Sequence, residues 1–238
     1  MLIDNFIETH CHILPGIDDG SADIDTSLKM IHRLKEQGAK GIILTPHYYS
    51  DSISYQDFIK KRDNSLAMLN EALTDNDPVL IPAAEVYMSH YLFNYENLDK
   101  LCIGNTRYAM IEHSFSCDFK RETYDRLMNL YYDYEIIPIL AHIERYSALM
   151  ENEKLLDSYI NAGCLVQVNI SSFAGAHRTV RKKLIKYLDS GRIHLIGSDC
   201  HNLDSRPPDY EAGIKVIEKK LGHCAVERLV NNSQILLK

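Results

Sequence analysis

The sequence lacks the features that define several large classes of protein. Only 11 of its 238 residues are glycine and 7 are proline, and no segment is of low complexity, which argues against disorder. No apolar run reaches the roughly 18 residues that span a bilayer. Asp4 and Glu8 stand where a signal peptide would have a basic stretch and an apolar core. These absences predict a soluble, cytoplasmic protein with no membrane insertion.

Positive charge is also scarce. Lys and Arg number 26 against 33 Asp and Glu, which gives a net charge of −7. A chain this acidic lacks the electrostatic footprint of a nucleic-acid-binding protein and would be repelled by anionic membranes. Glycine-rich G-x-G-x-x-G and G-x-x-x-x-G-K-[ST] loops are missing as well, which excludes dinucleotide and P-loop sites.

The six cysteines form no C-x-x-C pair and read as reduced thiols. Cys200 and Arg206 do have the C-x5-R spacing of cysteine-based phosphatases. The loop between them has no glycine and contains Asp204, and Asp199 precedes it. Because carboxylates repel both a thiolate and a phosphate, this spacing does not indicate a cysteine phosphatase.

What the sequence does contain is a regular alternation of short apolar runs and amphipathic segments. The runs are mostly continuous, as in parallel strands buried on both faces. They cover residues 6–13, 41–45, 79–84, 108–111, 136–141, 164–169 and 193–197. Several of the helical segments between them stop at a glycine, namely Gly38, Gly163, Gly191 and Gly222. Seven such repeats without a linker predict one α/β domain over residues 1–238, either an open doubly wound sheet or a barrel.

Metal-binding side chains or an amide follow all seven predicted strands. In chain order they are His10 and His12 with the nearby Asp18 and Asp19, then His47, Glu85, Glu112, His142, Asn169, and finally Asp199 and His201. In a β/α barrel all strand ends point to one face, whereas a doubly wound sheet would spread them along an edge. The pattern therefore favours a barrel and predicts a functional site on that face.

The donor types limit the metal. Imidazole and carboxylate groups without thiolate suit Mn, Fe or Zn. The histidines and carboxylates at these strand ends exceed what one ion binds, so two or three ions are predicted, with one carboxylate bridging. Such clusters make water a hydroxide near neutral pH and clamp the attacking and leaving oxygens at phosphorus.

Two arginines indicate the substrate class. Arg145 follows the ligand of the fifth strand and Arg206 follows those of the seventh. Guanidinium groups bind phosphate in a bidentate manner, so the pair predicts a phosphate ester as substrate. The alternative is that each arginine pairs with a nearby acid, such as Glu144 or Asp204.

These motifs resemble those of the PHP (polymerase and histidinol phosphatase) family. The segments that carry the resemblance are His10-Cys-His12-Ile-Leu-Pro-Gly-Ile-Asp-Asp-Gly20, Thr45-Pro-His47, Ala84-Glu85, Ile111-Glu112, Ala141-His-Ile-Glu-Arg-Tyr146 and Ser198-Asp-Cys-His-Asn202. More closely, nearly the whole chain resembles the manganese-dependent bacterial protein-tyrosine phosphatases of capsule and exopolysaccharide loci, the CpsB/YwqE type. The resemblance implies a distorted, TIM-like, seven-stranded (β/α)7 barrel that holds three metal ions, expected to be Mn²⁺.

The resemblance also implies a set of ligands and a substrate. His10, His12, Glu85 and Asp199 would hold one ion. Glu85 would bridge to a second, bound also by Glu112 and His142, while Asp19, His47 and His201 would hold the third. Members of the type dephosphorylate the tail of a bacterial tyrosine autokinase, and so regulate polysaccharide synthesis. A metal-activated hydroxide would attack phosphorus while Arg145 and Arg206 stabilise the developing charge.

Other interpretations stay open. A PHP enzyme could instead act on histidinol phosphate or a nucleotide. A metal-dependent amidohydrolase also uses H-x-H on its first strand, although it commonly has a carboxylated lysine where this chain has Glu112. A metal-storage protein would have no use for the two arginines. The chain departs from the family at Glu8, at His113 and over residues 171–180, and the sequence leaves the metal and the oligomeric state open.

Overall fold

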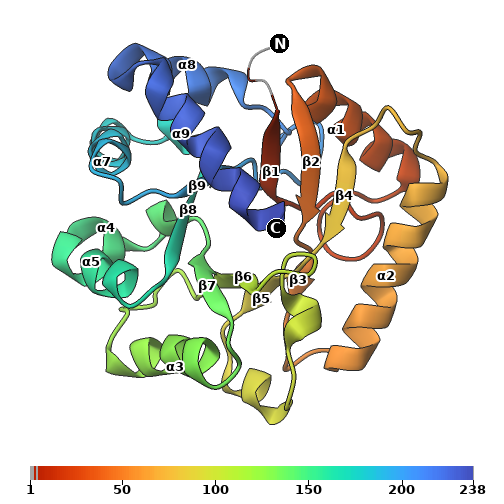
Figure 1. Cartoon of the computed structure of the whole chain (residues 1–238), viewed down its shortest axis with the longest axis horizontal. Coiled ribbons are helices and arrows are strands. Elements are labelled where there is room, and N and C mark those ends of the chain that lie inside the picture. Colours follow the sequence, from red (N-terminus) through yellow and green to blue (C-terminus); the bar gives the residue numbers. More distant parts are fainter. Residues whose placement is uncertain (1–2, 4, 238) are drawn as a thin grey trace.

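The computed structural model describes residue 3 and residues 5–237, in which the strands lie at the centre and the helices surround them (Figure 1). The strands are β1 (Phe6–Cys11), β2 (Ala39–Leu44), β3 (His47–Tyr48), β4 (Val79–Pro82), β5 (Glu85–Tyr87), β6 (Tyr108–Glu112), β7 (Ile137–Leu140), β8 (Leu165–Asn169) and β9 (Leu195–Gly197). The α-helices are α1 (Ile24–Glu36), α2 (Tyr55–Glu71), α3 (Arg121–Tyr132), α4 (Ser147–Glu151), α5 (Glu153–Asn161), α6 (Ser172–Gly175), α7 (Arg178–Asp189), α8 (Glu211–Leu221) and α9 (His223–Ser233). Four short 3₁₀ helices complete the described chain: η1 (His90–Asn94), η2 (Asp99–Leu101), η3 (Ile143–Arg145) and η4 (Gln234–Leu237).

The strands form two parallel sheets. One has the order β1-β2-β4 and the other β3-β5-β6-β7-β8-β9. Just beyond the ladders, β1 and β9 meet at a bridge between Cys11 and Cys200. There the Asp199 amide donates to the His10 carbonyl over 2.7 Å, and the His12 amide donates to the Cys200 carbonyl over 2.9 Å. The carboxyl ends of the first and last strands therefore lie side by side.

The α/β class with parallel strands is confirmed, but the predicted count of seven strands is not. The described residues contain nine strands, because the predicted runs 41–45 and 79–84 each continue into a second, shorter strand. Thr45 and Pro46 separate β2 from β3, and proline has no amide hydrogen to offer a ladder. Ala83 and Ala84 separate β4 from β5, next to the break between β2 and β3. The chain keeps its direction at both breaks, but β3 and β5 join the second sheet.

The apolar core has two layers. The inner one consists of side chains from the inward faces of the strands, including Ile7, Ile43, Met110 and Ile139. Leu236 of η4 belongs to this inner layer too. The outer layer, between strands and helices, contains most of the remaining buried apolar residues. The C-terminal segment α9–η4, which crosses in front of the strands in Figure 1, thus packs on the inner layer at the end away from the strands' carboxyl termini.

Helix ends agree with the predicted glycine stops. α1 ends at Glu36, just before Gly38, and α8 ends at Leu221, just before Gly222. Helix α9 was not predicted, because it follows α8 directly and no strand separates the two. None of the helices between residues 5 and 237 is long and apolar enough to cross a bilayer.

One buried side chain leads to a stability prediction. His113, next to the carboxyl end of β6, is 4% exposed, and both its ring nitrogens lack a hydrogen-bond partner among the described residues. Its ring packs on Phe119 and Tyr146. Because a buried polar group without a partner costs stability, His113→Phe is expected to raise the free energy of unfolding by about 1 kcal/mol at pH 7.

The same variant is expected to change the pH dependence of stability. Burial lowers the pKa of His113 to about 3, whereas an unfolded histidine titrates near about 6.5. The unfolded chain therefore binds the extra proton first, and stability falls as the pH drops below about 6.5. Urea unfolding at pH 6.5 and pH 5 should show the wild type losing about 1.5 kcal/mol more than His113→Phe. Equal losses in the two proteins would contradict this account of His113.

Candidate metal centre

The structure brings all nine predicted metal ligands together at one end of the sheets, where β1, β6, β7 and β9 end and where His47 and Glu85 begin the short strands β3 and β5. They are His10, His12, Asp19, His47, Glu85, Glu112, His142, Asp199 and His201. Seven of them are buried, while His47 is partly exposed and the side chain of Asp19 is 66% exposed. The cluster therefore has a closed floor and an open rim on the Asp19 side.

The first group of donors is His10, His12, Glu85 and Asp199, whose ligand atoms lie within 4.8 Å of one another. The Nε2 atoms of His10 and His12 each lie 3.2 Å from Oε2 of Glu85. The same two nitrogens lie 3.6 and 3.4 Å from Oδ1 of Asp199. Two imidazoles and two carboxylates thus converge on one small volume.

Two further groups share members with the first. One contains His47, Glu85 and Glu112, and the other contains His12, Asp19, His47 and His201. His142 is outside these three groups, but it lies next to two of their members: its Nε2 is 2.8 Å from Oε1 of Glu85 and 3.6 Å from Oε1 of Glu112. These distances place His142 beside Glu85 and Glu112, the two residues with which the family resemblance groups it.

The buried nitrogens of the cluster fit metal ions. Nε2 of His10, His12 and His201 has no hydrogen-bond partner in the described chain, although each is buried. The opposite nitrogen is held in two of these rings: Nδ1 of His12 by Oδ2 of Asp18 at 2.8 Å, and Nδ1 of His201 by the Asp199 carbonyl at 3.0 Å. An imidazole that donates from one nitrogen and leaves the other free is oriented as a metal ligand.

The charges of the cluster also call for cations. Burial raises the pKa of Glu85, but His10, His12 and His142 outweigh it and hold that pKa well below the ordinary value. Burial and the charge of Glu85 raise the pKa of Glu112 to about 7. Two close carboxylates cannot both ionise at low cost unless a cation lies between them, which is what a divalent metal supplies.

Backbone strain concentrates at the ligands. His142 has φ 33° and Asp199 has φ 54°, in the left-handed region that non-glycine residues rarely adopt. Two glycines permit close packing behind the ligands. A Cβ on Gly197 would lie 2.6 Å from Cβ of His10, and one on Gly20 would lie 2.1 Å from the His12 carbonyl oxygen. The fold therefore tolerates local strain in order to hold these side chains.

Both predicted arginines reach the cluster. Nη2 of Arg145 and Nη2 of Arg206 each lie 2.7 Å from Oδ2 of Asp199. Nδ2 of Asn169 donates to the same oxygen over 2.8 Å. Each arginine does pair with an acid, but the acid is Asp199 and neither Glu144 nor Asp204. Since Oδ1 of Asp199 faces His10 and His12, one carboxylate connects the arginines to the first group of donors.

Three residues outside the predicted ligand set support the site. Gln167 lies 3.4 Å from Nδ1 of His10 and accepts from the His142 amide over 2.6 Å. Glu8 accepts from the amides of His10 and Ser198 over 2.9 and 3.0 Å. Asp18 accepts from the amides of Gly20 and His47, each over 3.0 Å, besides holding His12. Asp18 was marked by its place beside Asp19 after the H-x-H motif and Glu8 by its departure from the family, whereas nothing in the sequence marked Gln167.

Asp18 gives a direct test of the metal centre. Asp18→Asn is expected to lower metal affinity by about 10- to 100-fold, because the His12 ring loses the carboxylate that orients it. Titration of the metal-loaded protein with a chelator measures this change. Asp23→Asn, at the N-cap of α1, is the matched control and should keep wild-type affinity. Equal affinity of Asp18→Asn and wild type would refute the assigned role.

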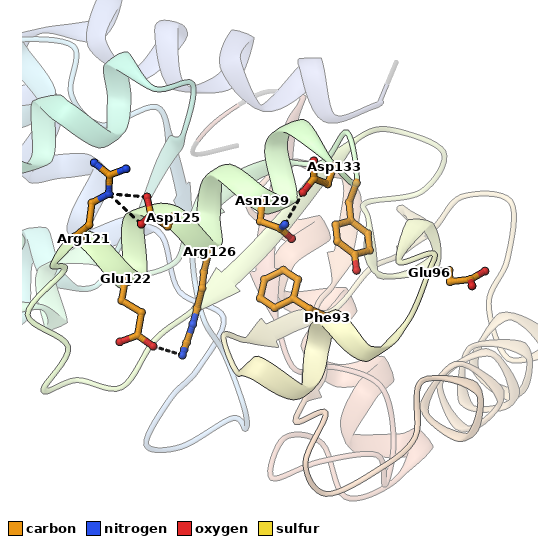
Figure 2. A pocket seen from close by; sticks show the side chains of 9 residues that line it. Phe93, Glu96, Arg121, Glu122, Asp125, Arg126, Asn129 and Asp133 are labelled. Carbon is orange, nitrogen blue, oxygen red and sulfur yellow. Dashed lines mark hydrogen bonds and ion pairs between the residues drawn. The ribbon is translucent and has the colours of Figure 1, made fainter.

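A separate cavity of about 950 Å³ lies along α3, away from these ligands (Figure 2). Arg121 and Arg126 line it, but they pair with Asp125 and Glu122 of the same helix. Neither guanidinium is thus left free for a phosphate, so this cavity does not compete with the metal centre as a phosphate site.

Comparison with known proteins agrees with this geometry. The sequence profile of a family described as "Capsular polysaccharide synthesis, CpsB/CapC" matches residues 6–238. The chain belongs to the CpsB/CapC family. It is 30% identical to the tyrosine-protein phosphatase CpsB of Streptococcus agalactiae, over 98% of each chain. It is 29% identical to the tyrosine-protein phosphatase YwqE of Bacillus subtilis, over 98% of this chain and 91% of that one.

A solved structure extends the CpsB/CapC match to three dimensions. It comes from a study of YwqE from Bacillus subtilis and CpsB from Streptococcus pneumoniae, described as unique metal-dependent tyrosine phosphatases. The TM-score is 0.82 at 27% identity, and the match covers 97% of this chain and 94% of the other. The predicted family is therefore confirmed, and these relatives carry the activity that the sequence predicts.

Proposed function

We propose that this CpsB/CapC chain is a metal-dependent protein-tyrosine phosphatase that acts on the phosphorylated tail of a bacterial tyrosine autokinase. One observation carries the proposal: Arg145 and Arg206 converge on Asp199, which also faces two histidines of the metal-ligand cluster. Guanidinium groups next to metal ligands in one open cluster suit a phosphate monoester. The names of the relatives support phosphotyrosine as the substrate, and the description of the family supports a role in capsule synthesis.

We further propose that the cluster holds three ions, with Mn²⁺ as the resident metal. Glu85 would be the bridging ligand, because its two oxygens face different histidines: Oε2 lies 3.2 Å from Nε2 of His10 and of His12, and Oε1 lies 2.8 Å from Nε2 of His142. Bound there, the ions supply the Lewis acidity that makes water a nucleophile near neutral pH and that offsets phosphate charge. Histidine and carboxylate donors without thiolate support Mn²⁺, Fe or Zn over softer metals.

The residues of the chain divide the remaining work. Arg145 and Arg206 exchange Asp199 for the nonbridging oxygens of the substrate and stabilise the charge that develops there. Water oxygen forms the new bond to phosphorus, the aryl ester bond breaks with its electron pair on the phenolate, and the proton that water loses ends on the phenol. A phenol has a pKa of about 10, so this leaving group depends less on a general acid than an alkoxide does. Asn169 keeps Asp199 in place while the arginines move.

We also propose an architecture and a compartment. The two sheets are parts of one distorted (β/α)7 barrel in a single domain. In it, β2 with β3 and β4 with β5 each form one broken strand. The bridge between Cys11 and Cys200 supports that closure. The six free cysteines support a reducing compartment, the cytoplasm.

Phosphate release from a phosphotyrosyl peptide and from histidinol phosphate, compared side by side with the Mn-loaded protein, tests the function. Strong preference for the peptide is expected, with loss of activity on chelation and recovery on adding Mn²⁺. Preference for histidinol phosphate would keep the metal centre but overturn the substrate. Release from neither would refute the phosphatase itself.

A further inference from the structure

A cavity of about 400 Å³ opens beside the metal-ligand cluster, between the end of β3 and the first turns of α2. Asp19 and His47, both members of one donor group, form its wall on the metal side. A substrate whose phosphate lies on those ligands therefore has this space next to it. Engineered apolar cavities of about 150 Å³ bind benzene, so the volume is ample for one aromatic ring and part of the chain that carries it.

Apart from Asp18, Ser52 and Lys61, the rest of the lining is apolar. Ile17 and Ile53 contribute aliphatic surface, and Phe58 lies buried at the base. Lys61 also lines the cavity, and its Nζ donates to the Ile17 carbonyl over 2.7 Å. The cavity thus joins a polar, metal-binding end to an apolar body, which is the polarity of an aryl phosphate.

Tyr49 presents an aromatic surface in this wall. Its ring centroid lies 5.4 Å from that of His47 and 5.5 Å from that of Tyr87, and the residue is 37% exposed. A second exposed aromatic, Phe115, stands elsewhere around the cluster, 5.9 Å from His142 and 5.5 Å from the guanidinium of Arg145. Of the two, Tyr49 lines a cavity that also contains donor residues, whereas Phe115 is occupied by contact with Arg145.

We propose that the cavity beside Asp19 and His47 is the leaving-group subsite, and that the ring of the substrate's phosphotyrosine packs against Tyr49 within it. This inference rests on the proposed phosphatase function and adds the residue that selects an aryl over an alkyl ester. Offset or tilted aromatic pairs with centroids about 4.5–7 Å apart attract beyond their buried area. Tyr49 is accordingly a specificity-determining residue, with its ring as the group that acts.

The test measures binding of the substrate's ring separately from binding of its phosphate. KM for phenyl phosphate and the inhibition constant of inorganic phosphate are measured on the Mn-loaded wild type and on Tyr49→Ala. Inorganic phosphate reaches only the metals and arginines, so its inhibition constant should stay within about twofold. KM for phenyl phosphate should rise about tenfold, which is the effect of losing one aromatic contact.

Three further variants sharpen the result. Tyr49→Phe keeps the ring and should match wild type for both ligands. Ser52→Trp places a large side chain at the exposed rim of the cavity. It should raise KM for phenyl phosphate and leave the inhibition constant of inorganic phosphate unchanged. Phe115→Ala is the matched aromatic control, and it should change the two constants by the same factor.

Several outcomes would overturn the assignment. An unchanged KM for phenyl phosphate in Tyr49→Ala is one such outcome, and equal weakening of phenyl phosphate and phosphate binding is another. If Phe115→Ala raised KM for phenyl phosphate but not the inhibition constant of phosphate, the leaving-group subsite would lie on the Arg145 side. Failure of the phosphatase function has a different signature, because the wild type itself would then release no phosphate from phenyl phosphate.

Discussion

His201→Ala is expected to lose more than about 100-fold in metal-dependent turnover of a phosphotyrosyl peptide, and His142→Ala the same. Each change removes an imidazole from the cluster itself, and loss of even an outer partner of a metal ligand costs about 10- to 100-fold. His201 Nε2 has no hydrogen-bond partner in the described chain and lies 3.5 Å from Oδ1 of Asp19. The measurements are turnover, metal content and urea unfolding, which should stay cooperative.

The matched controls are histidines on the surface. His32 and His223 have side chains that are 57% and 68% exposed, and both lie on helices remote from the cluster. Their alanine variants should keep wild-type turnover and metal content. Full activity of either His142→Ala or His201→Ala would show that the cluster is not the catalytic centre.

The second large effect concerns the arginines. Arg145→Ala and Arg206→Ala are each expected to lower kcat by about 10²–10³, the usual cost of removing one group that stabilises transition-state charge. Arg→Lys at either position should recover only part of the loss, because an ammonium cannot form the bidentate contact. Since both side chains lie on the same oxygen of Asp199, the double variant should lose less than the product of the single losses.

Metal content separates catalysis from indirect damage. Asp199 is also a member of the first donor group, so an arginine variant that released metal would be acting through that carboxylate. Expected instead is full metal content with reduced kcat. Arg33→Ala, which removes a partly exposed ion pair with Asp209 at 3.2 Å, is the control and should be unchanged. A kcat within twofold of wild type in both alanine variants would remove the arginines from the mechanism.

The strand-end histidines and carboxylates were predictable because two regularities act together. Side chains alternate along a strand, so His10 and His12 share a side, and parallel strands deliver their ends to one face. Gln167 was not predictable, because its role depends on the particular pairing of β8 with its neighbours, which places its amide between His10 and His142. The ligand types follow from the residue types, whereas the residues that orient the ligands depend on the register of the strands.

The secondary structure was likewise predictable only in part. Periodic apolar residues predicted most helices, and glycines marked where α1 and α8 end. The short strand β3 was missed, because the predicted run ended at Thr45 and only two strand residues follow Pro46. Asn169 was noted only as an amide at a strand end, and its contact with Asp199 requires β8 and β9 to be paired. Hydrophobic pattern predicts the elements, but not where a hydrogen-bond ladder changes sheet.

The junction of β1 with β9 has a consequence for how the protein is made. It joins His10 and His12 to Asp199 and His201, so any segment that contains both halves must span residues 10–201. Contacts so distant in sequence form slowly, and synthesis proceeds from the amino terminus at about 5–20 residues per second. A nascent chain consequently carries its first two histidines for many seconds before their partners exist. Completion of the metal centre is therefore a late event, which follows translation of β9.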